Sequence, residues 1–124
     1  MTRILFIGDI VGRPGRYILR RVLPALVTTR QINLVIANGE NAAAGFGITP
    51  DIAEDLFERG VAVITGGNHS WDKKEIMPYM AERPRLLRPA NFPAGAPCHG
   101  SVVVTANNGV RVGVINVMGR VFMQ

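Results

Sequence analysis

Gly-Gly-Asn-His-Ser-Trp-Asp stands at residues 66–72, directly after an apolar run at residues 61–65. A short apolar run of this kind predicts a buried strand, and residues 71–79 predict a helix that follows it. Asn68 and His69 would then lie where a strand passes into a helix. In open α/β sheets, ligands bind at this edge, beyond the carboxyl ends of the strands. The alternative is a glycine-rich turn whose histidine is merely solvated.

Two earlier apolar runs end in loops with similar side chains. Residues 4–7 run into Asp9, and residues 34–37 run into Glu40 and Asn41. Segments with helical spacing separate the three predicted strands, and this alternation of strand and helix predicts a parallel sheet with right-handed crossovers. Neighbouring parallel strands would bring the three loops together on one rim of the sheet.

The first predicted helix begins at Arg16, and Pro24 within it should kink or restart it because proline lacks a backbone donor. In the second, Thr49 is the expected N-cap, Pro50 the first helical residue and Gly60 the C-terminal cap. Both helices have an apolar face. The apolar face of the first helix is formed by residues at four-residue spacing: Ile18, Val22 and Leu26.

The chain changes character after residue 79. Four prolines punctuate residues 84–97, where Leu86 and Leu87 form a short extended piece. Residues 101–106 and 110–117 are β-rich and are joined through an Asn-Asn-Gly sequence, which is a strong hairpin signal. We therefore predict an α/β fold in which parallel strand–helix units are followed by a β-hairpin. Residues 1–124 show no internal repeat and no linker, so they belong to a single domain.

Composition indicates a globular protein. The chain has 124 residues, of which 48% are hydrophobic. No apolar run approaches the roughly 20 residues of a membrane-spanning helix, and residues 4–7 are too short for a signal peptide. Cys98 is the single cysteine, so it forms no internal disulfide, which fits a reducing compartment. We expect a cytoplasmic protein without a membrane partner, and we interpret Cys98 as a bystander rather than a nucleophile.

The net charge of +5 comes from 14 Lys and Arg against 9 Asp and Glu. This excess is compatible with an anionic substrate such as a phosphate ester, and with loose affinity for RNA or DNA. A solvated helix face and a basic loop would also account for it. Aromatic residues are only 6% of the chain and do not alternate with the arginines, as they usually do in proteins that bind single-stranded nucleic acid.

The three loops carry a set of side chains that suits divalent metals. Hard oxygen donors with one nitrogen donor favour Mn, Fe or Zn. Two-metal hydrolases hold their ions about 3.5–4 Å apart, for which a bridging carboxylate is the natural device. Glu40 would bridge, Asp9 and Asn68 would each bind one ion, and Asn41 would ligate or donate to a phosphate oxygen. His69 would protonate the leaving alkoxide as a general acid.

Each of these residues also has a purely structural interpretation. Asp9 could cap a turn, Glu40 could pair with an arginine, and Asn41 is an ordinary turn former. Arg13 could contact a phosphate, although a surface role is the simpler interpretation. His99 lies in the proline-rich segment and is left out of the predicted site.

These motifs resemble the first three blocks of the calcineurin-like metallophosphoesterases, in residues 8–12, 39–43 and 67–69. The sequence of these motifs is closer to the branch of YmdB-like phosphodiesterases. Four stretches also resemble this branch: residues 40–43, 67–72, 88–91 and 118–123. The likeness covers essentially the whole chain. Two departures from the superfamily pattern, Val11 in place of a histidine and Glu40 in place of an aspartate, look typical of this branch.

The resemblance implies a metallophosphoesterase-type α/β/β/α sandwich with two divalent metal ions, Fe or Mn, with Zn or Mg as alternatives. It implies hydrolysis of small phosphodiesters, with 2′,3′-cyclic nucleotides as the expected class. By position, Asp9, Glu40, Asn41 and Asn68 match the metal and phosphate residues of the branch, and His69 matches its general acid.

The length of this chain departs further from the family pattern than these two substitutions do. Family members run to about twice this size, within the range of a large single domain. Their remaining ligands are histidines of a later half, including a Gly-His-x-His block, whereas this chain has only His69 and His99. Two ions need more ligands than these loops supply. We therefore predict an incomplete sandwich: an N-terminal half that binds metal weakly, has little or no activity and needs a partner copy, as a homo-oligomer, or a second half.

Two other functions remain open at this stage. The first is a non-catalytic nucleotide- or RNA-binding module on a Rossmann-like sheet, although Gly8, Gly12 and Gly15 do not have the spacing of the dinucleotide fingerprint. The second is an assembly role in which the exposed sheet edge recruits another chain.

Overall fold

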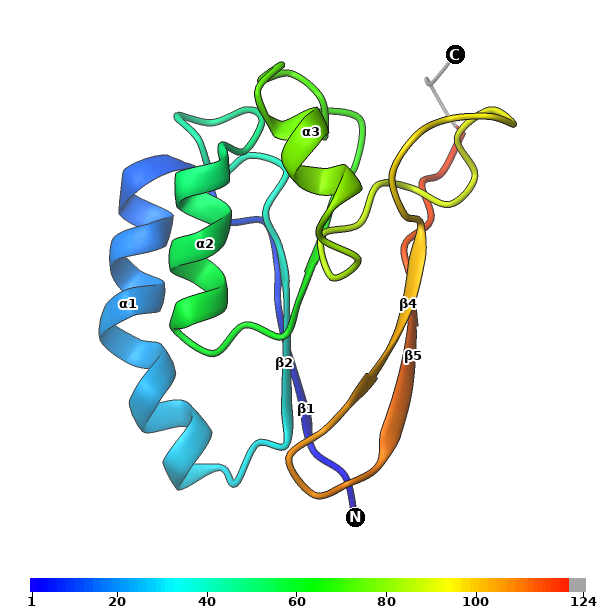
Figure 1. The fold of residues 1–124 in the computed structure, drawn as a ribbon. Coiled ribbons are helices and arrows are strands. Elements are labelled where there is room, and N and C mark those ends of the chain that lie inside the picture. The colour runs from blue at the N-terminus through cyan, green and yellow to red at the C-terminus, as the bar shows by residue number, and fades with distance from the viewer. Residues whose placement is uncertain (121–124) are drawn as a thin grey trace.

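A computed structural model describes residues 1–120 of the protein. Three parallel strands form one sheet in the order β1-β2-β3, and three helices lie on one of its faces (Figure 1). A two-stranded antiparallel hairpin lies on the other face. The elements in chain order are β1 (Ile4–Ile7), α1 (Gly12–Thr29), β2 (Leu34–Asn38), α2 (Pro50–Glu58), β3 (Val63–Thr65), α3 (Ile76–Ala81), β4 (Ser101–Thr105) and β5 (Arg111–Ile115). The predicted parallel units followed by a hairpin are confirmed.

The sheet is buried on both faces over β2 and β3, which explains their continuous apolar sequences. Successive side chains of a strand point to opposite faces. Val35, Ala37 and Ile64 pack under the helices. Their neighbours on the other face pack against the hairpin in a second cluster that includes Leu34, Ile36, Val63, Val104 and Val114. The hairpin is therefore held to the parallel sheet by side-chain packing.

Helix α1 differs from the prediction in its first residue and in its course through Pro24. It begins at Gly12 rather than Arg16, and Pro14 falls in its first turn, where no backbone donor is needed. It also continues through Pro24, so a restart at this residue was the wrong interpretation. Pro24 is exposed, so its ring faces solvent rather than packed side chains. Because proline has no backbone N–H, it costs the helix one backbone hydrogen bond. No helix in residues 1–120 is long and apolar enough to cross a membrane.

Helix α2 begins and ends as its capping residues predict. The Thr49 side chain accepts a hydrogen bond from the Ile52 amide at 3.4 Å, and Pro50 is the first helical residue. Gly60 follows the C-cap with a φ of 104°, a left-handed conformation that favours glycine.

Helix α3 begins later than predicted, at Ile76 rather than Trp71. The reason is Pro78. In a helix from residue 71, its missing amide would be needed in the interior, but in a helix from Ile76 it falls in the first turn, whose donors have no intrahelical partner. Residues 70–75 form turns and bends instead, with the Asp72 amide donating to the His69 carbonyl at 3.2 Å.

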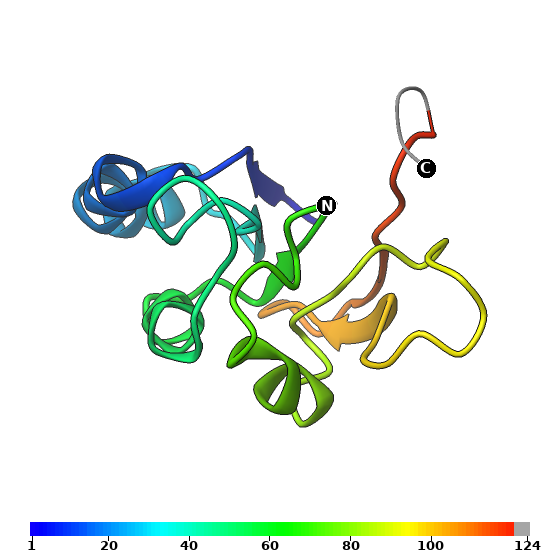
Figure 2. The same ribbon diagram turned by 90° about the horizontal axis from the view of Figure 1, so that it is seen from above.

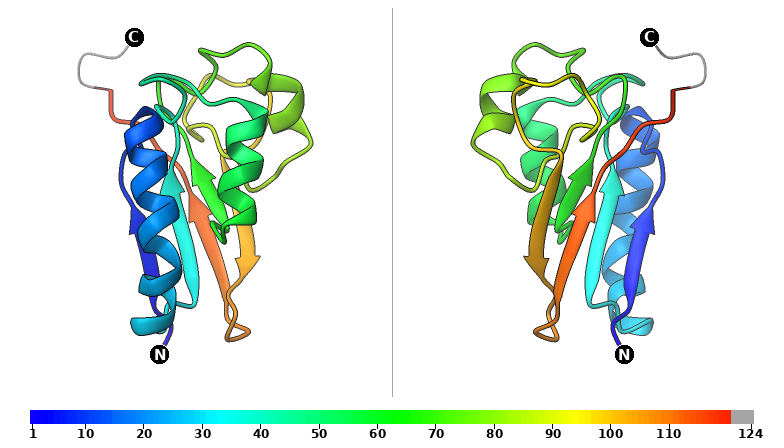
Figure 3. Two further views of the ribbon diagram at one scale, coloured as in Figure 1. Left: turned by 90° about the vertical axis from the view of Figure 1, so that its left-hand side faces the viewer. Right: turned by 90° about the vertical axis from the view of Figure 1, so that its right-hand side faces the viewer.

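The two sheets are joined on one side and open on the other. Leu86 bridges to Ile64 of β3, and Leu87 bridges to His99 just before β4, which confirms the short extended piece. On the opposite side, β1 and β5 are the outer strands of their sheets in the described part of the chain (Figure 3). The hairpin turn lies at residues 106–110, where the Ala106 amide donates to the Val110 carbonyl at 2.8 Å.

Candidate functional site

The loops after β1, β2 and β3 lie at the same end of the sheet, as expected for parallel strands (Figures 1 and 2). Backbone hydrogen bonds connect them in sequence. The Gly12 amide donates to the Asn41 carbonyl at 3.0 Å, and the Gly39 amide donates to the Thr65 carbonyl at 3.0 Å. These bonds hold the loop residues of all three strands on one rim.

Asp9 and Asn41 form the first part of this rim. The Asn41 side-chain amide donates to both carboxylate oxygens of Asp9, at 2.9 and 3.1 Å. Its carbonyl oxygen, Oδ1, is buried and has no hydrogen-bond partner in residues 1–120. Buried polar atoms are normally satisfied. An amide oxygen of this kind is a ligand type that binds hard cations.

Glu40 forms the second part. Its carboxylate is half-buried and lies against Gly67, where an added Cβ would come within 2.2 Å of Oε1. It accepts hydrogen bonds from the His69 backbone amide at 3.3 Å and from the Asn38 side chain at 3.4 Å, both long. Within the described part of the chain, the ion pairs of the arginines and lysines do not involve Glu40. The alternative interpretation, that Glu40 pairs with an arginine, is therefore wrong.

His69 is oriented by a residue to which the sequence reasoning assigned no role. Its ring Nδ1 lies 2.5 Å from Oδ2 of Asp72, and both side chains are partly exposed. This hydrogen bond leaves Nε2 as the ring nitrogen available to a ligand. The spacing of three residues between a histidine and an aspartate was the signal that could have found Asp72.

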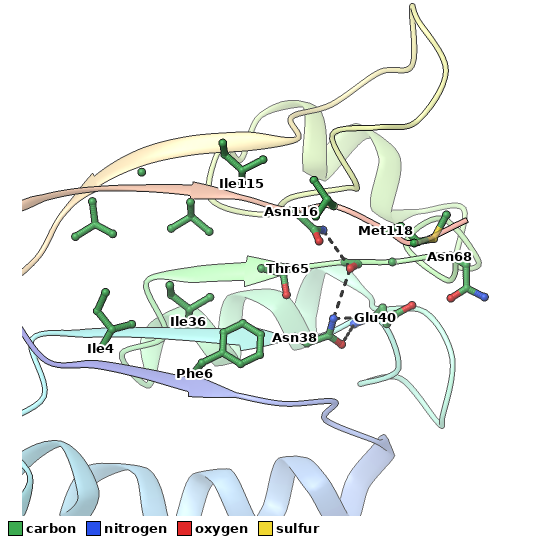
Figure 4. Close-up of a pocket in the computed structure, with 17 residues that line it drawn as sticks. Ile4, Phe6, Ile36, Asn38, Glu40, Thr65, Asn68, Ile115, Asn116 and Met118 are labelled. Carbon is green, nitrogen blue, oxygen red and sulfur yellow. Dashed lines mark hydrogen bonds between the residues drawn. The ribbon is translucent and has the colours of Figure 1, made fainter. Parts of the chain in front are cut away.

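Glu40 and Asn68 line an open groove of about 710 Å³ between the two sheets. Figure 4 shows its polar end, where Asn38 and Asn116 approach from opposite sheets. Both side-chain amides donate to the Gly66 carbonyl, at 3.5 and 3.1 Å. Asn116 was also missed from the sequence, although it follows an apolar strand in the same way as the other polar residues of the rim.

Asp9, and three other residues that the sequence analysis weighed, do not line the groove of Glu40. Asp9 lines a second groove on the helix side of the sheet rather than the groove of Glu40. Arg13 is exposed on the first turn of α1 and lines neither groove. Cys98 is half-buried, and burial raises the pKa of its thiol, which fits a residue without a nucleophilic role. His99 lies at the bridge to Leu87.

The rim gathers few side chains that could bind a metal ion. In residues 1–120, no three His, Cys, Asp or Glu side chains gather as a group that could hold a metal ion. The rim carries the carboxylates of Asp9 and Glu40 and the side-chain amides of Asn41 and Asn68. Asn41 contacts Asp9, whereas Asn68 is exposed and shares the lining of one groove with Glu40. This donor set suits a hard divalent cation but is too small for two of them.

Comparisons with known proteins identify relatives of this chain. The chain is 50% identical over 121 residues to the 2′,3′-cyclic-nucleotide 2′-phosphodiesterase of Bacillus subtilis (strain 168), a match that covers 98% of this chain and 46% of that protein. A crystal structure of a hypothetical protein from Thermus thermophilus matches with a TM-score of 0.89 and 39% identity, over 98% of this chain and 47% of that one.

A crystal structure of a novel phosphatase from Mycoplasma pneumoniae matches with a TM-score of 0.86 and 34% identity, over 95% of this chain and 43% of the other. The chain thus spans a little less than half the length of these relatives. A family model described as YmdB-like protein matches residues 5–124. The match runs through every loop of the rim, and the chain belongs to the YmdB-like protein family.

Proposed function

We propose that this chain is the N-terminal part of a metal-dependent phosphodiesterase or phosphatase that acts on 2′,3′-cyclic nucleotides or related phosphodiesters. The observation that carries the proposal is the half-buried Glu40 carboxylate, which has no cationic side chain as a partner in the described residues and lies where the three loops meet. The name of the Bacillus subtilis relative supports the substrate class.

Asp9, Glu40 and Asn68, with Asn41, would hold two divalent cations, Fe or Mn in our proposal. The unpartnered Oδ1 of Asn41 fits this role because a cation would satisfy it. When bound, such ions polarise a phosphoryl oxygen and lower the pKa of a bound water. The contribution of the chain is to hold Glu40 against Gly67 and to fix Asn41 on Asp9, so that the carboxylates stay in place without an arginine between them.

His69 would donate a proton from Nε2 to the leaving alkoxide. Asp72 holds the other ring nitrogen, so the ring keeps one orientation toward the rim. A positioned general acid of this kind contributes about 10²–10⁴-fold to a rate. Asn38 and Asn116 would keep the Gly66–Gly67 backbone, and with it the loop of His69, in register with Glu40.

The donor count supports a further part of the proposal, that residues 1–120 are not a sufficient active site. Each hard cation takes roughly four to eight ligands. Two carboxylates and two amide oxygens fall short of this requirement for two ions. We therefore expect weak metal binding and little hydrolysis from this chain alone.

Hydrolysis of bis-p-nitrophenyl phosphate with added Mn²⁺ tests the proposal. The chain would be assayed alone and after co-expression with the segment of the Bacillus subtilis relative that it does not match. We expect activity mainly in the co-expressed sample, and its loss in the double variant Asp9→Asn with Glu40→Gln. Activity that the double variant retains would contradict the proposed site. Mononucleotide binding that neither chelator nor this variant affects would favour a non-catalytic binding module instead.

A further inference from the structure

The loop after β2 carries an exposed aromatic side chain close to the proposed general acid. We define the aromatic platform as Phe46, in this loop, together with Lys73, in the turns after β3. We propose that the aromatic platform binds the nucleobase of the substrate, so that Phe46 makes the enzyme prefer nucleoside phosphodiesters to phosphodiesters without a base. This inference rests on the proposed function, because it places the base on the side of His69.

The chemistry of the proposed reaction determines where a nucleobase must lie. His69 would protonate the leaving alkoxide, and in a 2′,3′-cyclic nucleotide the oxygen of this alkoxide belongs to the ribose. The ribose also carries the base. The nucleoside therefore lies on the leaving side of the phosphorus, which is the side of His69. A residue that contacts the base is expected among the neighbours of the loop that holds His69.

Phe46 is connected to this loop by direct contacts. The Nζ atom of Lys73 lies over the Phe46 ring, 4.7 Å from its centroid. A Cβ added to Gly47 would come within 2.8 Å of the Lys73 Cγ and 3.3 Å of the Asp72 Cβ, so the two loops touch at this point. The Asp72 carboxylate in turn holds Nδ1 of His69. The aromatic platform and the proposed general acid are thus parts of one contact network.

The loop holds Phe46 in a defined position. The Phe46 amide donates to the Ala43 carbonyl at 3.1 Å, and the Ala43 amide donates to the Gly47 carbonyl at 2.9 Å. Gly47 has a φ of 76°, a left-handed conformation that favours glycine. A Cβ added to Gly12 would lie 3.7 Å from the Ala44 Cα, so the loop is packed between the start of α1 and the turns after β3 (Figure 2). A ring that is fixed before the ligand arrives loses little conformational entropy on binding.

Other aromatic side chains are less suited to this role. Three of them are exposed in residues 1–120, namely Phe6, Tyr17 and Phe46. Phe6 lines the groove between the two sheets, and Tyr17 lies on α1. Trp71, in the loop after β3, is half-buried and packs edge to face against Phe92, with ring centroids 5.0 Å apart. Phe46, which is 49% exposed, is therefore the aromatic residue of the rim, within the described part of the chain, that a base can reach.

The chemistry of the aromatic platform defines the ligand class. A phenyl ring offers a face on which any base can stack, and it has no hydrogen-bonding group that could read the edge of a base. The Lys73 ammonium is attracted to the ring and adds a positive charge near an anionic substrate. We therefore expect purine and pyrimidine nucleotides to be accepted alike.

The test compares two cyclic phosphodiesters with and without a base. Adenosine 2′,3′-cyclic phosphate and glycerol 1,2-cyclic phosphate share the cyclic phosphate ring, and only the first has a base. For both, kcat/KM would be measured with Mn²⁺ in the sample co-expressed with the Bacillus subtilis segment. Phe46→Ala would be compared with Tyr17→Ala. Tyr17 is a matched control because it is 53% exposed and also has a cation, Arg21, over its ring, 5.7 Å from the centroid.

We expect Phe46→Ala to lower kcat/KM about tenfold for the adenosine substrate and by less than about twofold for the glycerol substrate, because only the first loses a stacking contact. Phe46→Trp, which restores an aromatic face, should keep the discrimination between the two substrates. Tyr17→Ala should change neither value. Equal losses on both substrates, no loss on either, or the same loss in Tyr17→Ala would each overturn the proposal.

A binding measurement separates this inference from the proposed function. The isotope-labelled chain alone would be titrated with adenosine 3′-monophosphate in EDTA and followed by the NMR shifts of its backbone amides. We expect shifts at residues 44–47 and at Lys73, and binding about fivefold or more weaker in Phe46→Ala than in Tyr17→Ala. The absence of these shifts in the wild type would overturn the proposal. Binding at the aromatic platform in a protein that hydrolyses neither substrate would refute only the proposed function.

Discussion

Two glutamates of this protein lie in opposite electrostatic settings. Glu54 of α2 accepts hydrogen bonds from the Tyr79 hydroxyl at 2.5 Å and from the Arg83 guanidinium at 3.0 and 3.1 Å. These contacts, the Tyr79 hydrogen bond first and then Arg83, lower the pKa of Glu54. The Glu54 charge is thus balanced by a cation of the same cluster, which fastens α2 to α3 and the residues after it.

Among residues 1–120, Glu40 has hydrogen-bond donors but no such cation. Its partners are a backbone amide and an asparagine side chain, both neutral and both at long distance. Removing a carboxylate from water is costly unless a charge compensates it. The difference teaches that hydrogen bonding alone does not separate a structural carboxylate from a functional one. The distinguishing feature of Glu40 is that it lacks a cationic partner among the described residues, and in the proposed function a bound metal would supply that positive charge.

The largest expected effect is a loss of metal-dependent hydrolysis in Glu40→Gln. In the sample co-expressed with the Bacillus subtilis segment, we expect a fall of about 100-fold or more, because one lost electrostatic contact to a developing charge costs that much. Glu54→Gln should leave the rate within about twofold. Hydrolysis assays at saturating Mn²⁺ measure both.

Glu40→Gln and Glu54→Gln should also differ in their effect on the free energy of unfolding. In metal-free protein, we expect Glu40→Gln to leave the free energy of unfolding unchanged or to raise it, because it removes an uncompensated charge. Glu54→Gln should lower it. Urea titrations with EDTA measure the two changes, and a large destabilisation by Glu40→Gln would mean that the carboxylate has a structural partner after all.

Gly67→Ala should have the next largest effect. Its Cβ would lie 2.2–2.4 Å from the Glu40 carboxylate atoms, so the carboxylate or the loop must move. Because these atoms are the end of a flexible side chain that can swing aside, we expect little loss of stability but weaker Mn²⁺ binding, since the carboxylate is displaced. Gly8→Ala is the matched control, because a Cβ there meets no atom within 4 Å. Thermal unfolding and isothermal titration with Mn²⁺ would be compared for the two variants, and equal behaviour would remove Gly67 from the site.

Asp72→Asn should lower kcat by about tenfold while KM stays unchanged, because the hydrogen bond of the His69 ring loses its charged acceptor while the ring keeps its position. Asp51→Asn, on the first turn of α2, is a control that should change neither parameter. Steady-state kinetics on bis-p-nitrophenyl phosphate would measure both, and a rise in KM alone would assign Asp72 to substrate binding rather than to positioning.

The smallest effect concerns Tyr79. Burial, and then its hydrogen bond to Glu54, raise the pKa of Tyr79 from 10.0 to about 12. The protonated phenol is therefore favoured in the folded state, and this stabilisation is present below pH 10 and is lost as the pH rises toward 12. Tyr79→Phe should cost about 0.5–1 kcal/mol of stability at neutral pH, since the cluster is largely exposed.

Chemical denaturation at several pH values checks this prediction. The difference in stability between wild type and Tyr79→Phe should be constant from about pH 7 to 9 and should shrink between pH 10 and 12. It should also shrink as the pH falls below 4.5, the ordinary pKa of Glu54, because the protonated carboxyl loses its charge. A difference that does not vary with pH would show that Tyr79 acts through packing alone.

Most of the fold follows from local patterns in the sequence. The apolar runs, the Thr49-Pro50 cap and the Asn-Gly turn each predict an element that the structure contains. The start of α3 was predicted wrongly because the apolar spacing of residues 71–79 outweighed the position of Pro78. Local spacing carries no information about where a proline must fall within a helix until its first residue is known.

The candidate site was less accessible to sequence reasoning. Loops that follow parallel strands could be placed on one rim, and the contacts of Asp9 with Asn41 and of Glu40 with the His69 backbone agree with this placement. Asn116 could not be found in the same way, because its role depends on how the hairpin packs across the sheet. Such packing is a tertiary property that no local pattern encodes.

The contrast between the two sheets also sets an order for folding. Pairing of Ile4 with Leu34 closes a loop of about 30 residues, whereas Val104 and Val112 of the hairpin are joined by a short turn. Hairpins form within about 1–10 μs, while parallel pairings wait for long loops to close. We therefore expect the C-terminal hairpin to form early and to remain without its packing surface until β2 and β3 align, so the slow step of folding belongs to the first two-thirds of the chain.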